Sequence, residues 1–269
     1  METLIFRLYA PLASFGEVAV GEYRGSHLYP ARSAVLGLLA AALGIEREDE
    51  ASHAELAAGH QIAVALLEPG SLLRDYHTAQ VPSSSSLKKR PHRTRADELA
   101  LPKDDLNTIL STRDYRQDAV SLIAVTQRSD ASGRWSLAEV AAALRKPRFT
   151  LYLGRKCCPP ALPLQPLVLS VDSLRAAFVA YQQVMREAGE AAKAKLKRGA
   201  TFRDIAALLE WWEGLHPYRV AWEDGVSSGY QASMEVQRKD QPLSRRRWQF
   251  ADRTEHVSLL DDSTSEEAA

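Results

Sequence analysis

The order of short apolar segments in the first 154 residues limits the fold of this chain more than any other feature. Four segments have the length and the apolar composition of strands: 3–11, 60–70, 118–127 and 148–154. Two segments between them, 30–44 and 136–147, have the apolar spacing of helices. The order strand, helix, strand, strand, helix, strand is that of the split β-α-β arrangement. The sequence therefore predicts the α+β class and a ferredoxin-like domain.

End signals support both predicted helices. Ser136 and Glu139 have the spacing of a capping box, and Pro147 stops that helix. In the first helix, Gly44 follows the last apolar residues, a position where glycine commonly ends a helix. The segment 118–127 is apolar on both alternating faces, so we expect it to be a central strand of the sheet.

The second and third predicted strands are separated by the long segment 70–117, where a short turn is typical. Five cations follow a serine run within it: Lys88, Lys89, Arg90, Arg93 and Arg95. They fit a solvated loop, or a mobile arm that pairs with phosphates and releases counterions. Long insertions are usually functional or disordered. Because this one joins two central strands of a sheet type that RNA-recognition domains also use, we favour an RNA-gripping insertion at about 78–113.

Four prolines within 157–166 interrupt the pattern and predict a domain boundary. The chain thus divides into a first domain, 1–165, a smaller β-rich part, 166–260, and a tail, 261–269. The β-rich part is expected to contain an added helical pair and five short strands: 172–216 for the helices, and 167–171, 218–223, 230–237, 246–251 and 255–260 for the strands. The tail is acidic and polar, so we expect it to be disordered.

Composition excludes several classes of protein. Lys+Arg and Asp+Glu both number 34, so any contact with nucleic acid must rest on local positive charge. The two cysteines, Cys157 and Cys158, are adjacent, which strains a disulfide, and no Cys/His spacing resembles a zinc site. We expect no metal and no cofactor. No signal peptide is recognisable and no apolar run reaches the roughly 18 residues of a membrane span, so a cytoplasmic protein without membrane contact is expected.

Three pairs of residues have the chemistry of phosphate contacts: Arg113 with Tyr115, Arg32 with Ser33, and Arg155 with Lys156. The first pair lies two apart, so in an extended chain the arginine can hold a phosphate while the ring stacks on a base. The second pair opens the first helix, where free backbone N–H groups attract anions. The third follows a glycine bend. Each pair also has a simpler explanation: an ion pair of Arg113 with Asp114, a helix cap, and an ordinary basic turn.

His77, in the stretch DYHT, is a candidate general base. With Tyr76 and a lysine of the insertion it could activate a 2′-hydroxyl for metal-independent RNA cleavage. Its chain neighbours point away from it in an extended strand, and no Ser–His–Asp order, carboxylate pair or GxxxxGK[ST] loop accompanies it. We therefore expect His77 to contact a ligand or to be structural rather than to catalyse.

Five stretches occur in order and at familiar spacing: APLASFG, YPARSAVLGLLAAALGI, LRDYHT, STRDYRQDA and PRFTLYLGRKCCPP. Together they resemble the CasD subunits of type I-E CRISPR Cascade complexes, within the RAMP superfamily, strongly over about 3–165 and weakly over about 218–260. The resemblance implies a ferredoxin-like domain with a long thumb, in a non-catalytic subunit that caps the 5′ handle of crRNA. The implied partners are the crRNA, the backbone subunit and the large PAM-recognising subunit, with target DNA met indirectly through guide pairing.

The resemblance also implies which residues contact the handle. Carried over by motif and extended to the neighbouring cations, they are Phe15, Arg32, Ser33, His77, Lys88, Lys89, Arg90, Arg113, Tyr115, Arg155 and Lys156. Relatives usually have a tryptophan directly before the arginine that corresponds to Arg113, whereas this chain has Thr112 at that position. Two alternatives remain open: a metal-independent endoribonuclease that processes precursor crRNA, and a scaffold with little RNA contact.

Overall fold

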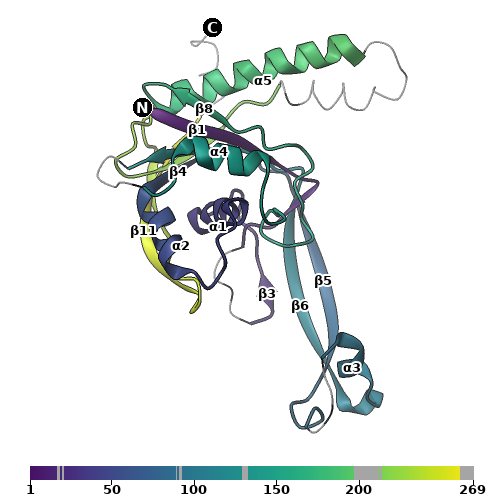
Figure 1. The fold of residues 1–269 in the computed structure, drawn as a ribbon. Coiled ribbons are helices and arrows are strands. Elements are labelled where there is room, and N and C mark those ends of the chain that lie inside the picture. The colour runs from purple at the N-terminus through teal and green to yellow at the C-terminus, as the bar shows by residue number, and fades with distance from the viewer. Residues whose placement is uncertain are drawn as a thin grey trace.

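A seven-stranded antiparallel sheet forms the centre of the molecule in the computed structural model, which describes residues 1–16, 19, 21–88, 90, 93–128, 133–191, 212 and 214–260, and the backbone alone of 192–196. The strand order is β10-β11-β9-β4-β7-β1-β8 (Figure 1). The bounds of these strands are β1 Glu2–Tyr9, β4 His60–Glu68, β7 Val120–Gln127, β8 Leu167–Ser170, β9 Arg219–Glu223, β10 Met234–Ser244 and β11 Gln249–Leu259.

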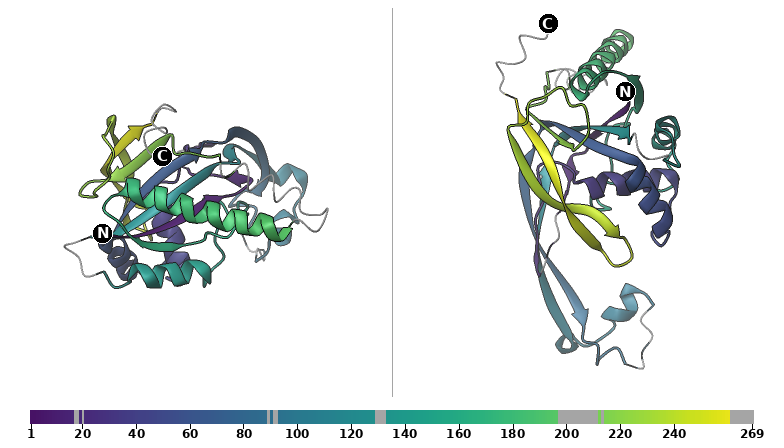
Figure 2. Two further views of the ribbon diagram at one scale, coloured as in Figure 1. Left: turned by 90° about the horizontal axis from the view of Figure 1, so that it is seen from above. Right: turned by 90° about the vertical axis from the view of Figure 1, so that its left-hand side faces the viewer.

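Helices cover both faces of this sheet (Figure 2). On one face lie α1 (Arg32–Leu43), α2 (Glu50–Gly59) and α4 (Leu137–Arg145), and on the other lies α5 (Leu174–Leu196). Successive side chains of a strand point to opposite faces, so β1 places Leu4 and Phe6 in the first core and Ile5 in the second. Nearly all of β7 is buried, which confirms that it is a central strand.

Between β4 and β7 the chain leaves the sheet as a long hairpin (Figure 1). Its strands, β5 (Ser71–Pro82) and β6 (Leu106–Gln117), pair antiparallel along their whole length. Two short strands pair with β6 near its base, and a short helix and a 3-10 turn lie at the far end: β2 Leu12–Ala13, β3 Tyr23–Arg24, α3 Arg95–Leu99 and η1 Lys103–Asp105. The sequence predicted the insertion but not its strands, because few of their side chains are buried and they leave no apolar face to detect.

The prediction of a strand at 148–154 is wrong. Leu151 and Leu153 are buried and alternate as strand residues do, but the segment is a loop. Its backbone N–H groups are bonded elsewhere: Arg148 and Phe149 donate to carbonyls at the end of α1, and Leu153 donates to the carbonyl of Cys158. The strand that pairs with the free edge of β1 is β8, which the sequence assigned to the next domain.

The C-terminal strands extend the same sheet beyond β4, through the pairing of β4 with β9. The predicted strands at 246–251 and 255–260 are one strand, β11, and the one predicted at 230–237 is the longer β10. The helix α2, capped by Asp49, was not predicted. The second helix of the pair predicted within 172–216 lies almost wholly outside the described residues, and so does the tail. None of the helices in the described part of the chain is long and apolar enough to cross a membrane.

Candidate nucleic-acid interface

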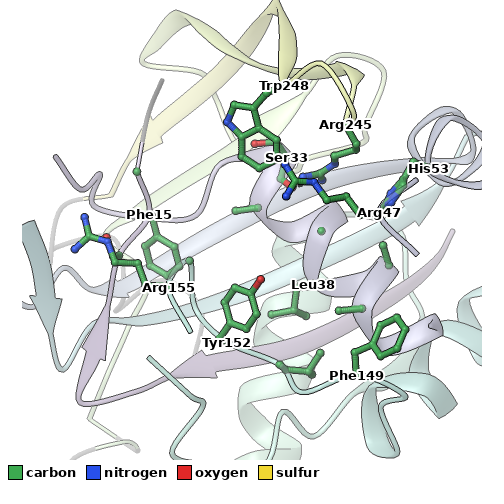
Figure 3. A pocket seen from close by; sticks show the side chains of 18 of the residues that line it. Phe15, Ser33, Leu38, Arg47, His53, Phe149, Tyr152, Arg155, Arg245 and Trp248 are labelled. Carbon is green, nitrogen blue, oxygen red and sulfur yellow. Dashed lines mark hydrogen bonds between the residues drawn. The ribbon is translucent and has the colours of Figure 1, made fainter. Parts of the chain in front are cut away.

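A groove of about 880 Å³ opens over one side of α1 (Figure 3). Its floor is α1, one wall is the loop that follows α4, and the tip of the β10–β11 hairpin closes its far end. Three of the predicted contact residues line it: Phe15, Ser33 and Arg155. Four arginines but only two glutamates are among its lining residues. The groove is therefore a concave, positively charged site of the size that holds whole ligands.

The loop that follows α4 brings two of these residues together. The backbone N–H of Ser14 donates to the carbonyl of Leu153 at 3.0 Å, so the chain at Phe15 lies against the chain before Arg155. Gly154, between them, has a φ of 85°, and a Cβ atom there would lie 1.6 Å from the carbonyl oxygen of Ser14. Only glycine fits this close approach. The bend predicted from the sequence is thus a packing requirement of the groove.

Arg155 lies over the ring of Tyr115, with its guanidinium carbon 4.4 Å from the ring centroid. It also donates to the backbone carbonyls of Asp114 and Arg24, each at 3.2 Å. These contacts fix Arg155 at the point where the groove meets the base of the hairpin. They also cover Tyr115, which is buried, so its ring has no open face for a base, contrary to the stacking role that the sequence suggested.

One face of the hairpin carries the other predicted contacts. The register pairs Leu73 with Tyr115, Asp75 with Arg113 and His77 with Ser111, and directly opposed residues lie on the same face. Arg113 is half-buried and forms no ion pair with any of the described residues. The Nδ1 atom of His77 lies 3.7 Å from a carboxylate oxygen of Asp75, and both side chains are exposed. The expectation that Arg113 and Tyr115 point the same way in an extended strand is consistent with this register, which adds His77 to the same face.

The opposite face of the hairpin is fastened at its base. Arg74 binds both carboxylate oxygens of Asp114, at 2.9 and 3.1 Å, and the hydroxyl of Tyr23 donates to the same carboxylate at 2.6 Å. The hydrogen bond from Arg74 is the main reason that the pKa of Asp114 is lowered. Hence Asp114 is paired with Arg74, and the ion pair with Arg113 that the sequence left open does not form.

Arg32 is not in the groove, and its prediction as a contact residue disagrees with its position. The side chain is buried and its Nε atom lies 2.7 Å from Glu223. The backbone N–H of Arg32 donates to Asp240 at 2.8 Å, so the chain's own carboxylate occupies the start of α1. Burial lowers the pKa of this arginine. The anion that the helix terminus was expected to attract is therefore already present, supplied by β10.

The remaining predicted cations lie apart from the groove. Lys88 and Arg90 are at the far end of the hairpin, after a serine turn in which Ser83 bonds Ser86, and Lys88 is exposed. Lys156 is exposed beside Arg155. Lys89 lies outside the described residues.

The groove also contains residues that sequence reasoning missed: Arg24 and, labelled in Figure 3, Arg47, His53, Arg245 and Trp248. The signal for the last two was the stretch SRRRW at 244–248, three arginines followed by an aromatic residue. The other three have no local pattern, because they reach the groove from separate parts of the chain: Arg24 from β3, Arg47 from the loop between α1 and α2, and His53 from α2.

Comparison with known proteins agrees with the resemblance. The family model described as CRISPR-associated protein (Cas5) matches residues 3–255. The chain belongs to the Cas5 family. A curated relative, the CRISPR system Cascade subunit CasD of Escherichia coli strain K12, is 34% identical over 169 residues, which cover 60% of this Cas5-family chain and 68% of the relative.

Two solved structures have the same fold as this Cas5-family chain. A chain of a structure titled CRISPR RNA-guided surveillance complex matches with a TM-score of 0.59 and 24% identity, over 96% of this chain and 90% of that one. A structure titled Crystal structure of Cas protein matches with a TM-score of 0.52 and 23% identity, over 97% and 96% of the two chains. The mixed α/β architecture with antiparallel sheets is thus shared with Cas proteins.

Proposed function

We propose that this chain is a non-catalytic subunit of a type I-E CRISPR Cascade surveillance complex, which binds and caps the 5′ handle of crRNA and helps to assemble the complex. In this proposal the sheet β8-β1-β7-β4 with its helices is the ferredoxin-like domain, and the β5–β6 hairpin is the thumb. The observation that carries the proposal is one continuous surface. Arg155 lies at the base of the hairpin face that carries His77 and Arg113. The same arginine also lines the groove, so the hairpin face and the groove adjoin each other.

The charge of this surface suits single-stranded RNA. The chain as a whole has no net charge, yet four arginines gather along the groove. Arginines bind phosphates, release counterions and leave bases free to stack on aromatic rings such as Tyr152, which is exposed in the groove. A scaffold with little RNA contact gives no reason for such a gathering of charge.

The proposed partners follow from the relatives. The E. coli relative is named as a Cascade subunit, and one structural match is titled as an RNA-guided surveillance complex. We infer that this chain contacts the backbone subunit and the large PAM-recognising subunit in the cytoplasm, without membrane contact. It would meet target DNA indirectly, because base pairing with the guide reads the sequence while the proteins hold backbone and shape.

The proposal that the subunit is non-catalytic rests on the surroundings of His77. Cleavage at a 2′-hydroxyl needs a base and an acid that converge on the reacting phosphate. Within the part of the chain that the structure describes, His77 pairs only with Asp75 on its own strand, and Tyr76 projects from the opposite face of the hairpin. The alternative, a metal-independent endoribonuclease that processes precursor crRNA, requires that repeat RNA be cut in EDTA and that His77→Ala abolish the cutting.

Arg113→Ala tests the binding proposal. The purified chain should bind repeat-derived RNA, and this variant should bind it more weakly, with a flatter dependence of log affinity on log salt by nearly one unit. Arg134→Ala is the matched control, because Arg134 is an exposed arginine outside the groove. Equal binding by Arg113→Ala, Arg134→Ala and the unchanged protein would contradict the proposal.

A further inference from the structure

Trp248 is placed where a tryptophan is costly to a folded chain. It lies in the turn between β10 and β11, its side chain is 57% exposed, and its backbone has a φ of 57°. A residue other than glycine is strained in this left-handed conformation. Hairpin turns normally use glycine, asparagine or aspartate at such positions. Strain and exposure of a large ring at one residue favour a functional explanation.

The turn that carries Trp248 is held in place from two sides. Arg245 donates to the backbone carbonyl of Ser33 on α1 at 2.7 Å, and the backbone N–H of Arg246 donates to Glu50 at the start of α2 at 3.0 Å. Gly37 leaves room for this contact, because a Cβ atom there would lie 3.3 Å from the guanidinium of Arg245. The tip of the hairpin is thus a fixed part of the groove.

The ring of Trp248 is itself oriented by its neighbours. The guanidinium carbon of Arg47 lies 5.0 Å from the ring centroid, and Phe250 meets the ring edge-on with centroids 5.7 Å apart. Figure 3 shows Trp248, Arg245 and Arg47 gathered at one end of the groove, away from Phe15 and Arg155. A ring held in one orientation loses little freedom when a ligand stacks on it.

Two positive charges accompany the ring, those of Arg47 and Arg245. Among the described residues, no carboxylate forms an ion pair with Arg47 or Arg245. Burial, followed by the nearby charge of Arg47, lowers the pKa of Arg245. Two like charges held together in a concave site raise the energy of the empty protein. A bound anion removes this cost, so the arrangement favours an anionic ligand.

We propose that Arg47, Arg245 and Trp248 form a nucleotide site in which a base of single-stranded RNA stacks on the Trp248 ring and the adjoining phosphate lies between the two arginines. The site rests on the proposed function, since RNA that follows the groove from Arg155 reaches it. A protein partner would also use tryptophan and arginine. The concave shape and the two arginines, which form no ion pair with a carboxylate in the described part of the chain, favour a polyanion instead.

The test compares four variants of the full-length chain: Trp248→Gly, Trp248→Phe, Arg47→Ala and Arg134→Ala. The guanidinium carbon of Arg134 lies 4.8 Å from the ring centroid of Trp135, outside the groove. Arg134→Ala therefore removes an arginine from a tryptophan ring, as Arg47→Ala does, but at a place that the RNA is not expected to reach. The probes are fluorescently labelled oligo(A) and oligo(U) RNA, measured by anisotropy over a range of salt concentrations. Trp248→Gly should bind both about 5- to 150-fold more weakly, as expected for one lost stacking contact.

Stability and salt dependence separate this site from a structural role. Glycine relieves the positive φ, so the melting temperature of Trp248→Gly should be unchanged or higher while RNA affinity falls. Its salt slope should stay constant, whereas Arg47→Ala should flatten the slope. Arg134→Ala should match the unchanged protein. RNA should quench the tryptophan fluorescence of the unchanged protein more than that of Trp248→Phe.

Three results would overturn the site. If Trp248→Gly binds RNA as the unchanged protein does while Arg113→Ala binds weakly, this site is wrong and the proposed function stands. If the unchanged protein binds no RNA, both are wrong. If Trp248→Gly keeps its RNA affinity but no longer co-purifies with other Cascade subunits, the ring contacts protein rather than RNA.

Discussion

Replacing Arg32 by methionine is expected to destabilise the fold without weakening RNA binding. The arginine is buried, its Nε atom lies 2.7 Å from Glu223, and its Nη2 atom donates to the carbonyls of Ala57 and His60. Breaking a buried pair by removing one partner costs about 3–5 kcal/mol. Because Arg128 still pairs with Glu223 at 3.1 Å, we expect the lower end, about 3 kcal/mol.

This loss is measurable by thermal and denaturant unfolding. At roughly 2–4 °C per kcal/mol for a chain of this size, the melting temperature should fall on the order of 10 °C. The double variant Arg32→Met/Glu223→Gln should recover part of the loss, since it removes a buried carboxylate charge that has lost one of its two arginine partners. The glutamine oxygen can still accept the backbone N–H of Ile62, which donates to Glu223 at 3.0 Å. RNA affinity, measured below the unfolding transition, should stay within about twofold of the unchanged protein.

A different pattern would refute this reasoning. If the unfolding free energy of Arg32→Met is less than about 1 kcal/mol below that of the unchanged protein, the buried pair of Arg32 with Glu223 does not stabilise the fold to the expected extent. If RNA affinity and the salt slope fall as well, Arg32 contacts RNA as the sequence suggested, and the start of α1 must be open in the protein that binds RNA.

The other predictions concern the glycine bend, the hairpin base and the histidine. Gly154→Ala should cost more unfolding free energy than Gly21→Ala, because both have positive φ but only the first meets a carbonyl oxygen; equal losses would mean that backbone strain alone matters. Asp114→Asn should be less stable than the unchanged protein at neutral pH. That difference should disappear as the pH falls below about 4, since the lowered pKa of Asp114 confers stability only while the group is ionised. His77→Ala should leave repeat RNA as intact in EDTA as the unchanged protein does, read on a denaturing gel, and weaken binding at most modestly.

Local signals predicted α1 and α4 well because the residues that decide them are neighbours in the chain, whereas α2 was not predicted. The capping box of Ser136 and Glu139 forms, and Gly44 ends α1 with a φ of 78°. The failure at 148–154 has an equally physical cause. Alternating burial shows which side chains point inward, but it does not show where the backbone hydrogen bonds go. Here they go to the end of α1, which a periodicity cannot reveal.

Site residues could be predicted from the sequence only where their partners are local. The two-residue spacing of Arg113 and Tyr115 correctly implied that they share a face of one strand. The role of Arg32 could not be predicted, since its partner Glu223 is 191 residues away. The burial of the Tyr115 ring under Arg155 could not be predicted either, because Arg155 lies in a loop 40 residues later in the chain.

Some arginines of this chain pair with buried acids and others line the groove. This difference explains how a protein with no net charge can present a basic surface. Glu223, Asp240 and Glu255 are almost fully buried, and they pair with arginines inside the fold: Arg32, Arg128, Arg238 and Arg253. Acids used in this way cannot neutralise the surface. The arginines at the groove are then left without carboxylate partners among the described residues, and their charge is available to a ligand. Net charge counts both kinds alike, so its value of zero says nothing against RNA binding. The charge that matters is set by which acids the fold buries.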